Sequence, residues 1–253
     1  MSFLDETMRW SLERAGILKR LMEGGIGDTA SLRDALKTVG GPSLIVEYKR
    51  CSPSAGVISL RSPEEYIGAT LPYTAAYSVL TEPRWFCGSP ELIPVFARHR
   101  PVLAKDFIVD KVQLEAYSRL GASAVLLIAR MLGGNLERLC RDARNLGLEV
   151  LVEAHNLDEA LKAYYTCPGA MLGVNSRDLT SLKVDFDGMI NVVRGIRREL
   201  GDRVMIVAES GVDSPERAVK ALDAGADALL IGTAAMRSPG LLRGIWAAYG
   251  SPP

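Results

Sequence analysis

Residues 43–56 read Ser-Leu-Ile-Val-Glu-Tyr-Lys-Arg-Cys-Ser-Pro-Ser-Ala-Gly, a short apolar run followed by turn residues. Such a pattern is typical of a buried strand that ends in a loop. Side chains alternate along a strand, so Ile45, Glu47 and Lys49 are expected on one face. A carboxylate and an ammonium group would then lie side by side where the strand ends. A structural ion pair would account for one such strand end, but several later apolar runs end in the same way.

From residue 43 onward the chain alternates between apolar runs and helical patterns. The strand-like runs occupy 43–49, 74–79, 101–107, 123–129, 148–153, 169–174, 203–208 and 226–231. Helical patterns lie between them, for example at 111–120, 135–146, 157–165 and 215–224. Strands that each precede a helix in this way predict an α/β protein with a closed (β/α)8 TIM barrel. An open doubly wound sheet is the alternative, but it normally carries a glycine-rich fingerprint after its first strand, which this sequence lacks.

The first 40 residues differ from the repeating unit. Apolar residues recur at helical spacing until Gly24 and Gly25, and a second short helix is predicted from Ser31 to Thr38. We therefore expect one domain over residues 1–253, made of a short helical N-terminal extension (1–40) and a barrel (43–250).

The charges of the chain balance, with 30 Lys and Arg against 30 Asp and Glu. Nothing therefore indicates a general attraction to nucleic acid or to an anionic membrane, and no apolar run approaches membrane-spanning length. The charged N-terminus does not resemble a signal peptide. The four cysteines, at positions 51, 87, 140 and 167, are far apart and form no CxxC pair, so neither a zinc site nor a disulfide framework is predicted. A reducing compartment fits, and we expect a cytoplasmic protein.

Polar residues gather at the predicted strand ends, where active sites of this fold lie. In chain order they are Glu47, Lys49, Ser78, Lys105, Arg130, Glu153, Asn175, Glu209, Ser210, Gly232 and Thr233. Strand parity places Lys105 on the face of Leu103, and Glu209 on the face of Val207. A barrel core of apolar layers has no use for such carboxylates and lysines at its rim unless they are functional or mutually paired. The set is therefore predicted to form an active site.

These strand ends carry an ordered series of short motifs. The series is Glu-Tyr-Lys-Arg-x-Ser-Pro-Ser at 47–54, Ser-Val-Leu-Thr-Glu at 78–82, Gly-Ser at 88–89, Lys-Asp-Phe-Ile at 105–108, Leu-Val-Glu at 151–153, Asn-Ser-Arg-Asp-Leu at 175–179, Ala-Glu-Ser-Gly at 208–211 and Leu-Ile-Gly at 230–232. In this order it resembles the indole-3-glycerol phosphate synthase family, (β/α)8 enzymes of tryptophan biosynthesis. The resemblance covers about residues 43–236.

The resemblance implies a carboxy-lyase that closes the indole ring of 1-(2-carboxyphenylamino)-1-deoxyribulose 5-phosphate with loss of carbon dioxide and water. It implies Lys105 as the general acid that protonates the ketone oxygen and Glu153 as the base. Lys49 would hold the substrate carboxylate and share acid duty. The polar ring would be completed by Glu47, Asn175, Glu209 and Ser210.

The chemistry of these residue types agrees with those roles. Carbonyl protonation and dehydration need an acid facing a base, and a lysine flanked by cations and desolvated can be tuned toward neutral pH. The implied reaction has no redox step, so neither a cofactor nor a metal ion is expected.

The substrate should bind in two parts. Its phosphate is expected at Ser210-Gly211 and Gly232-Thr233, where small residues expose backbone N–H groups near helix N-termini. Candidates for the apolar slot around the aromatic ring are Phe86, Phe107, Leu126, Ile128, Leu179 and Trp10. Further binding candidates within the motifs are Ser52, Ser78 and Arg177. The expected partner is thus a phosphorylated small molecule, with the chain a monomer or a weak homo-oligomer.

The sequence departs from the family pattern at a few positions. Residues 232–236 read Gly-Thr-Ala-Ala-Met instead of the common Gly-x-x-Leu-Met, and Cys51 and Cys87 occupy variable positions in motif loops. His155 follows a predicted strand end, where a structural role is expected. One alternative is another phosphate-binding barrel such as phosphoribosylanthranilate isomerase, which needs a cysteine–aspartate pair. A barrel that binds its ligand without turnover is the alternative from a different class.

Overall fold

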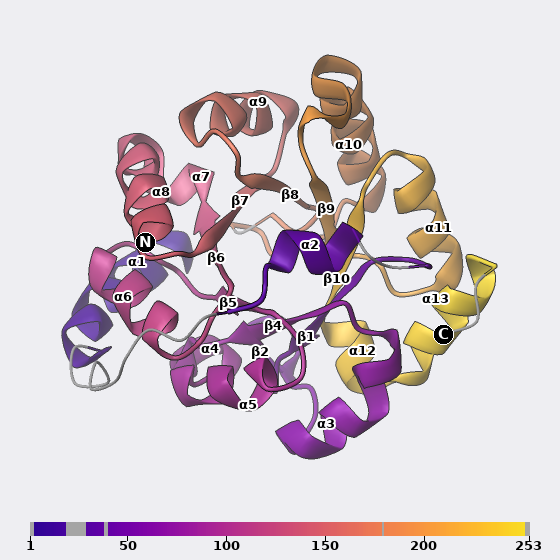
Figure 1. Ribbon diagram of the computed structural model, residues 1–253, viewed down its shortest axis with the longest axis horizontal. Helices are drawn as coiled ribbons and strands as arrows, with labels where there is room; N and C mark the ends of the chain where they lie inside the picture. Colours follow the sequence, from indigo (N-terminus) through magenta and orange to yellow (C-terminus); the bar gives the residue numbers. More distant parts are fainter. Residues whose placement is uncertain (1–2, 19–28, 38–39, 179, 251–253) are drawn as a thin grey trace.

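The computed structural model describes residues 3–18, 29–37, 40–178 and 180–250 and contains a closed barrel of parallel strands (Figure 1). Around the barrel the strands follow the order β1-β10-β9-β8-β7-β6-β5-β4. Their bounds are β1 Leu44–Tyr48, β4 Ala76–Leu80, β5 Val102–Lys105, β6 Ala124–Ile128, β7 Glu149–Ala154, β8 Met171–Asn175, β9 Ile206–Glu209 and β10 Ala228–Ile231. The predicted TIM barrel is confirmed, and each predicted strand run contains or overlaps one of these strands.

The barrel strands are buried on both faces, which explains why they read as continuous apolar runs instead of alternating ones. Parallel pairing fixes the height of each residue in the barrel: Glu47 pairs with Ser78, Ser78 with Leu103, and Leu80 with Lys105. On the far side Asn175 pairs with Glu209. The polar strand ends therefore meet at one mouth of the barrel.

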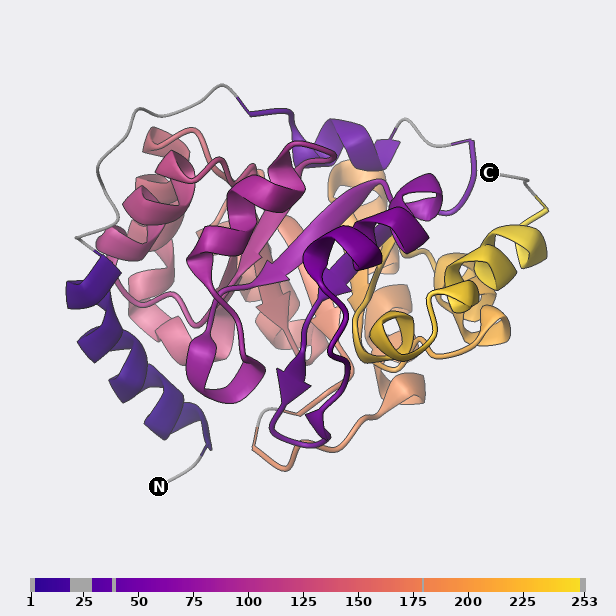
Figure 2. The same ribbon diagram turned by 90° about the horizontal axis from the view of Figure 1, so that it is seen from below.

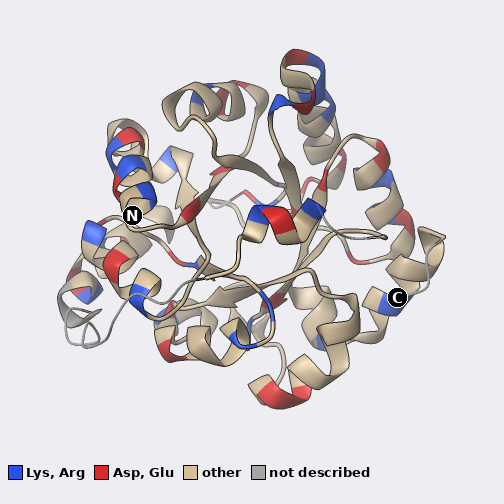
Figure 3. Cartoon of the chain, viewed as in Figure 1, with Lys and Arg blue, Asp and Glu red and all other residues tan. Residues whose placement is uncertain are grey.

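Helices surround the strands and carry residues of both charge signs, whereas the strands are mostly uncharged (Figure 3). Their bounds are α3 Pro63–Thr70, α4 Pro83–Phe86, α5 Ile93–Ala97, α6 Lys111–Arg119, α7 Ala129–Leu132, α8 Leu136–Asn145, α9 Leu157–Thr166, α10 Phe186–Leu200, α11 Pro215–Asp223, α12 Thr233–Arg237 and α13 Gly240–Ala248. The four helices predicted as examples correspond to α6, α8, α9 and α11. Within the described ranges, no helix combines the length and the apolar character needed to cross a bilayer.

Among the described residues, two helices precede the barrel, as predicted for the N-terminal extension. Helix α1 (Phe3–Leu18) lies along one side of the barrel (Figure 2), and α2 (Leu32–Lys37) lies over the end opposite the polar mouth. Ser31 donates a hydrogen bond to Glu149 at the start of β7, which fixes the position of α2. The predicted stop at Gly24 and Gly25 lies outside the described residues, as does Thr38.

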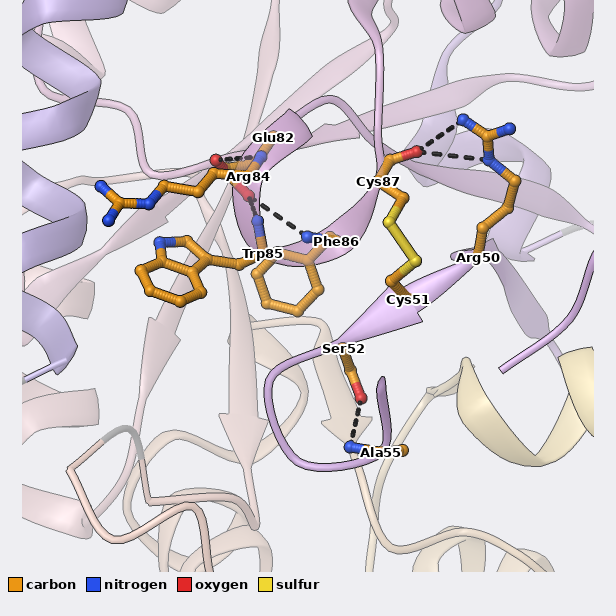
Figure 4. Close-up of a disulfide and its surroundings, with 9 residues drawn as sticks. All are labelled: Arg50, Cys51, Ser52, Ala55, Glu82, Arg84, Trp85, Phe86 and Cys87. Carbon is orange, nitrogen blue, oxygen red and sulfur yellow. Dashed lines mark hydrogen bonds between the residues drawn. A yellow bond between two sulfur atoms is a disulfide. The ribbon is translucent and has the colours of Figure 1, made fainter. Parts of the chain in front are cut away.

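The expectation that disulfides would be absent is wrong. Cys51 is bonded to Cys87, and Cys140 to Cys167, so the described residues hold no free cysteine. The cysteines are 36 and 27 residues apart in sequence, yet their Cα atoms lie 5.4 and 5.9 Å apart. Neighbouring strand–helix units lie side by side in the barrel and bring these positions together, and sequence spacing alone carries no record of that. The first disulfide lies at the polar mouth of the barrel (Figure 4).

Candidate active site

An ion-pair chain crosses the mouth of the barrel. Lys49 Nζ lies 2.7 Å from Glu47 Oε1, and Lys105 Nζ lies 3.3 Å from Glu47 Oε2. Lys105 Nζ also donates a hydrogen bond of 2.8 Å to Glu209 Oε2. Glu47 in β1, Lys49 just after it, Lys105 in β5 and Glu209 in β9 supply these groups. The ion pairs therefore link three sides of the barrel. Lys105 lies at the centre of this ion-pair chain, between two carboxylates.

Burial and ion pairing together determine the pKa shifts of Glu47 and Lys105 in this ion-pair chain. Burial opposes ionisation of Glu47, but the pairs with Lys49 and Lys105 outweigh it and lower the pKa of Glu47 to about 2. Burial would likewise lower the pKa of Lys105, yet Glu209, Glu47 and Glu153 reverse the effect and raise it. The expectation of a lysine tuned toward neutral pH by neighbouring cations is therefore wrong for Lys105. Its neighbours are carboxylates, which keep it protonated.

Glu209 has the opposite shift although it accepts a hydrogen bond from Lys105. Complete burial is the largest cause, and the nearby charges of Glu153 and Glu47 add to it, so the pKa of Glu209 is raised to about 7. Lys105 cannot offset both effects because it also pairs with Glu47. Near neutral pH this carboxyl group is therefore able to take up or release a proton.

Glu153 projects from β7 into the same cavity and is 2% exposed. Burial raises its pKa, against the opposing charge of Lys105. Within the described part of the chain its Oε1 atom has no hydrogen-bond partner, and His155 Nε2 lies 3.6 Å from it. Burial and the charge of Arg130 lower the pKa of His155, so this histidine is a neutral neighbour of Glu153. A buried carboxylate with an unused oxygen is available to accept a proton from a ligand.

Two glycines leave the space that these side chains occupy. A Cβ built on Gly173 would collide with Glu209 Oε1, and one built on Gly232 would collide with Glu47 Oε1. Any larger residue at either position would displace a carboxylate from the ion-pair chain. The missing side chains thus allow charged groups to pack inside an otherwise apolar barrel.

A cavity that is partly open to solvent lies above the charged groups. Its apolar wall includes Phe86, Phe107, Leu126 and Ile128, all predicted from the sequence. The Phe86 and Phe107 rings lie 6.1 Å apart between centroids, and Lys49 Nζ lies 6.0 Å from the centroid of the Phe86 ring. An aromatic ligand with an anionic substituent would match such a wall.

A second, more polar cavity adjoins the first. Ser210, Gly211, Gly232 and Thr233 line it together with Arg177, which also borders the first cavity. Burial lowers the pKa of Arg177. Further lining comes from Arg217 and Arg237. Backbone N–H groups at small residues, with guanidinium groups nearby, are suited to an anion such as a phosphate group.

The structure brings most of the sequence-predicted site residues to these two cavities. Those that line one or both are Glu47, Lys49, Ser52, Phe86, Lys105, Phe107, Leu126, Ile128, Glu153, Asn175, Arg177, Ser210, Gly211, Gly232 and Thr233. Glu209 lies beneath them and acts on the site through its hydrogen bond to Lys105. Leu179 lies outside the described residues.

Three predicted positions lie elsewhere. Ser78 is fully buried at the same height as Glu47, and its short side chain does not line either cavity. Trp10 donates a hydrogen bond of 3.0 Å to Glu82 instead of lining the apolar wall. Arg130, at the end of β6, belongs to α7 and pairs with Glu159 and Asp178 outside the cavities.

Helix α1 brings to the site residues that no sequence pattern indicated. Phe3 lines the first cavity, where its ring packs edge-on against Phe107. Arg14, which is 4% exposed, forms a buried ion pair with Asp106, the neighbour of Lys105. Helical spacing in the extension indicated an apolar face, but it could not show which side of the barrel that face covers. Among the described residues, no cluster of His, Cys, Asp and Glu suited to a metal ion is present.

Comparison with known proteins shows which family the chain matches. A profile of the indole-3-glycerol phosphate synthases matches residues 17–245. The indole-3-glycerol phosphate synthase of Aeropyrum pernix is 47% identical over 253 residues, covering 97% of each chain. The protein of the same name from Pyrobaculum arsenaticum is 40% identical over 214 residues, covering 84% of each chain.

The comparison with solved structures supports the fold. The 3-hexulose-6-phosphate synthase of Salmonella typhimurium matches with a TM-score of 0.63 at 16% identity, covering 82% of this chain and 98% of that chain. At this identity the likeness shows the fold alone. Because the family profile spans most of the sequence and the Aeropyrum relative spans nearly all of it, the chain belongs to the indole-3-glycerol phosphate synthase family.

Proposed function

We propose that this protein is an indole-3-glycerol phosphate synthase that converts 1-(2-carboxyphenylamino)-1-deoxyribulose 5-phosphate into indole-3-glycerol phosphate. The observation that carries the proposal is the position of Lys105, protonated between Glu47 and Glu209 at the floor of an aromatic-walled cavity. Family membership supports the same reaction. In this reaction a carbon–carbon bond to the carboxylate breaks, so the enzyme is a carboxy-lyase.

Lys105 acts as the general acid. Its ammonium group donates a proton to the ketone oxygen of the substrate while the aromatic carbon that bears the carboxylate attacks the carbonyl carbon. The carboxylate leaves as carbon dioxide and returns its electron pair to the ring. Glu47 and Glu209 hold Nζ in place, since a carboxylate oxygen of each lies within 3.3 Å of it.

Glu153 acts as the base in the dehydration that follows. The new hydroxyl group takes a proton from Lys49, which shares acid duty, and leaves as water, while Glu153 removes the proton that lets the indole double bond form. Its raised pKa and unpartnered oxygen suit proton uptake from the intermediate. Asn175, which lines the same cavity, orients the intermediate beside it.

Lys49 holds the substrate carboxylate until it leaves and shares acid duty with Lys105. Its Nζ borders the cavity between Glu47 and the Phe86 ring, so a benzoate group stacked on that ring would meet the ammonium. The phosphate group occupies the second cavity, at Gly211, Gly232 and Arg177.

The proposal also covers the partner, the oligomeric state and the location of the protein. The partner is a phosphorylated small molecule, and the chain works as one barrel domain, monomeric or weakly homo-oligomeric. We place it in the cytoplasm with its pathway. Disulfides are rare in that compartment except in hyperthermophiles, so this location also implies a heat-adapted source.

A turnover assay tests the proposal directly. Purified protein is mixed with the carboxyphenylamino-deoxyribulose phosphate, and the rise of indole fluorescence is followed. We expect saturable turnover that inorganic phosphate inhibits competitively and that the dephosphorylated substrate does not support. Binding of substrate without product would favour the non-turnover alternative, and isomerisation of phosphoribosylanthranilate would favour the other enzymatic one.

A further inference from the structure

The disulfide between Cys51 and Cys87 joins two loops that both line the substrate cavity. Cys51 lies in β2 (Cys51–Ser52), which pairs with β3 (Gly56–Val57) in a small hairpin after β1. This hairpin and the loop after β8 extend from the same end of the barrel (Figure 2). Cys87 directly follows helix α4, which carries Phe86. Both Ser52 and Phe86 line the first cavity.

Three consecutive residues after β1 contact the same turn. Lys49 Nζ lies 6.0 Å from the centroid of the Phe86 ring. Arg50 donates hydrogen bonds of 3.3 and 2.9 Å to the backbone oxygen of Cys87 (Figure 4). Cys51 is bonded to Cys87 itself. A cation–π contact, a charge-assisted hydrogen bond and a covalent bond thus act on one turn at once.

The turn that they hold is itself rigid. The Glu82 side chain accepts hydrogen bonds from the backbone N–H groups of residues 84, 85 and 86. Cys87 has a left-handed backbone with φ 52°, a conformation that costs a non-glycine residue free energy. A Cβ on the next residue, Gly88, would collide with the backbone oxygen of Leu80. The disulfide therefore fastens a short hairpin, in which two residues of β2 pair with two residues of β3, to a turn with one defined shape.

We propose that the Cys51–Cys87 disulfide is a positioning device that sets Lys49 and Phe86 for the substrate and makes substrate affinity depend on the thiol redox state. The inference rests on the proposed function for the roles of Lys49 and Phe86. A dithiol reductant transfers two electrons and two protons to the disulfide, gives two thiols and is itself oxidised to a disulfide. Reduction then removes the covalent link and leaves only the weaker contacts.

The second disulfide provides a matched control. Cys140 lies in α8 and Cys167 follows α9, both are 1% exposed, and neither lines the two cavities of the site. It closes a segment of 27 residues against 36 for the first disulfide, so the two should constrain the unfolded chain to a similar extent. Cys51 and Cys87 are partly exposed, so reductant should reach them first.

The experiment compares Cys51→Ser/Cys87→Ser with Cys140→Ser/Cys167→Ser and with wild type before and after treatment with a dithiol. We expect loss of the first disulfide to raise KM about tenfold, because freed loops must be ordered again on binding, while kcat stays within about twofold. The control pair should leave both constants unchanged. Reoxidation of reduced wild type should restore the low KM.

Amide hydrogen exchange supplies a readout that does not depend on turnover. Reduction should increase exchange in residues 51–57 and 84–88 and leave residues 140–167 protected. If the oxidised wild type showed no turnover, the proposed function would be contradicted. The exchange pattern would still decide whether the Cys51–Cys87 disulfide holds the hairpin in position. Equal KM values in both double variants, or unchanged exchange at the hairpin, would overturn the positioning role.

Discussion

Gly173 lies directly against the carboxylate of Glu209. A Cβ at position 173 would overlap Glu209 Oε1, although Gly173 pairs in register with Val207, two residues earlier in β9. The Glu209 side chain therefore folds back toward the barrel interior over the bare backbone of Gly173. From there its Oε2 accepts the hydrogen bond from Lys105. The absence of one methyl group thus lets a third carboxylate share the barrel interior with Lys105.

Replacing Gly173 by alanine should cost activity without unfolding the barrel. The new methyl group pushes Glu209 away from Lys105, and misplacement of a catalytic group by about 1 Å can cost roughly 10²-fold in rate. We expect kcat to fall by about that factor in the fluorescence assay, with an unchanged circular dichroism spectrum. Gly68→Ala in α3 is the control, since its Cβ enters open space. Equal rates for both variants would mean that Glu209 need not occupy this position.

The acid and base assignments predict large losses in turnover. General acid–base groups contribute about 10²–10⁴-fold each, so Lys105→Ala and Glu153→Gln should lower kcat by about that much while substrate still binds. Glu153→Gln keeps the shape of the side chain and removes its basicity. Steady-state kinetics combined with substrate binding at equilibrium would separate the two effects. Near wild-type turnover of Lys105→Ala with Lys49 intact would assign the principal acid to Lys49.

Substitution of Lys49 should act on binding as well as on rate. Its ammonium is placed to hold the substrate carboxylate, which is present in the ground state, so Lys49→Ala should raise KM and lower kcat together. Lys49→Arg keeps the charge and should restore part of the binding. A Lys49→Ala enzyme with normal KM would refute carboxylate holding.

Stability should fall as the pH rises toward neutrality because of Glu209. Its pKa is raised from 4.5 to about 7 in the folded protein, so its stabilising contribution is complete below pH 4.5 and is lost as the pH rises through about 7. A shift of this size corresponds to on the order of 3 kcal/mol. Urea unfolding at several pH values should show that Glu209→Gln has a flatter profile than wild type between these limits.

The pKa of Glu47 is shifted in the opposite direction to that of Glu209, so the same unfolding experiment distinguishes their contributions to stability. Its pKa is lowered to about 2, so its contribution is present above pH 4.5 and is lost as the pH falls toward 2. Glu47→Gln should therefore flatten the acidic end of the profile instead of the neutral range. If both variants changed the stability in the same pH range, the opposite pKa shifts of Glu47 and Glu209 would be wrong.

The barrel could be predicted from the sequence because its strands are continuous apolar runs that end in charged residues. Their positions at strand ends were then enough to predict that Glu47, Lys105 and Glu153 lie together, since all strand ends meet at one mouth. Side-chain reach was harder to predict. Ser78 shares its height with Glu47, yet the serine side chain is too short to reach the cavity.

Contacts between distant segments could not be predicted. The pairing of Cys51 with Cys87 depends on how β1 and β4 lie side by side, and the approach of Arg14 to Asp106 depends on where α1 packs. The raised pKa of Lys105 also depends on which charges surround it in space. These features come from tertiary proximity, which a linear pattern does not record.

The final prediction concerns helix α1, whose Phe3 lines the substrate cavity against Phe107. Deleting the whole extension would also remove Arg14 and leave Asp106 without its buried cation, so loss of binding and loss of stability would be confused. Phe3→Ala separates them, because this ring is partly exposed and lines the cavity, where an aromatic contact with the bound substrate is worth about 0.5–1.5 kcal/mol, or roughly two- to tenfold in KM. We expect that rise in KM with kcat and melting temperature nearly unchanged. Leu12→Ala, on the same helix and 53% exposed, should leave KM as it is. A Phe3→Ala enzyme with wild-type KM would show that α1 covers the site without contributing to substrate binding.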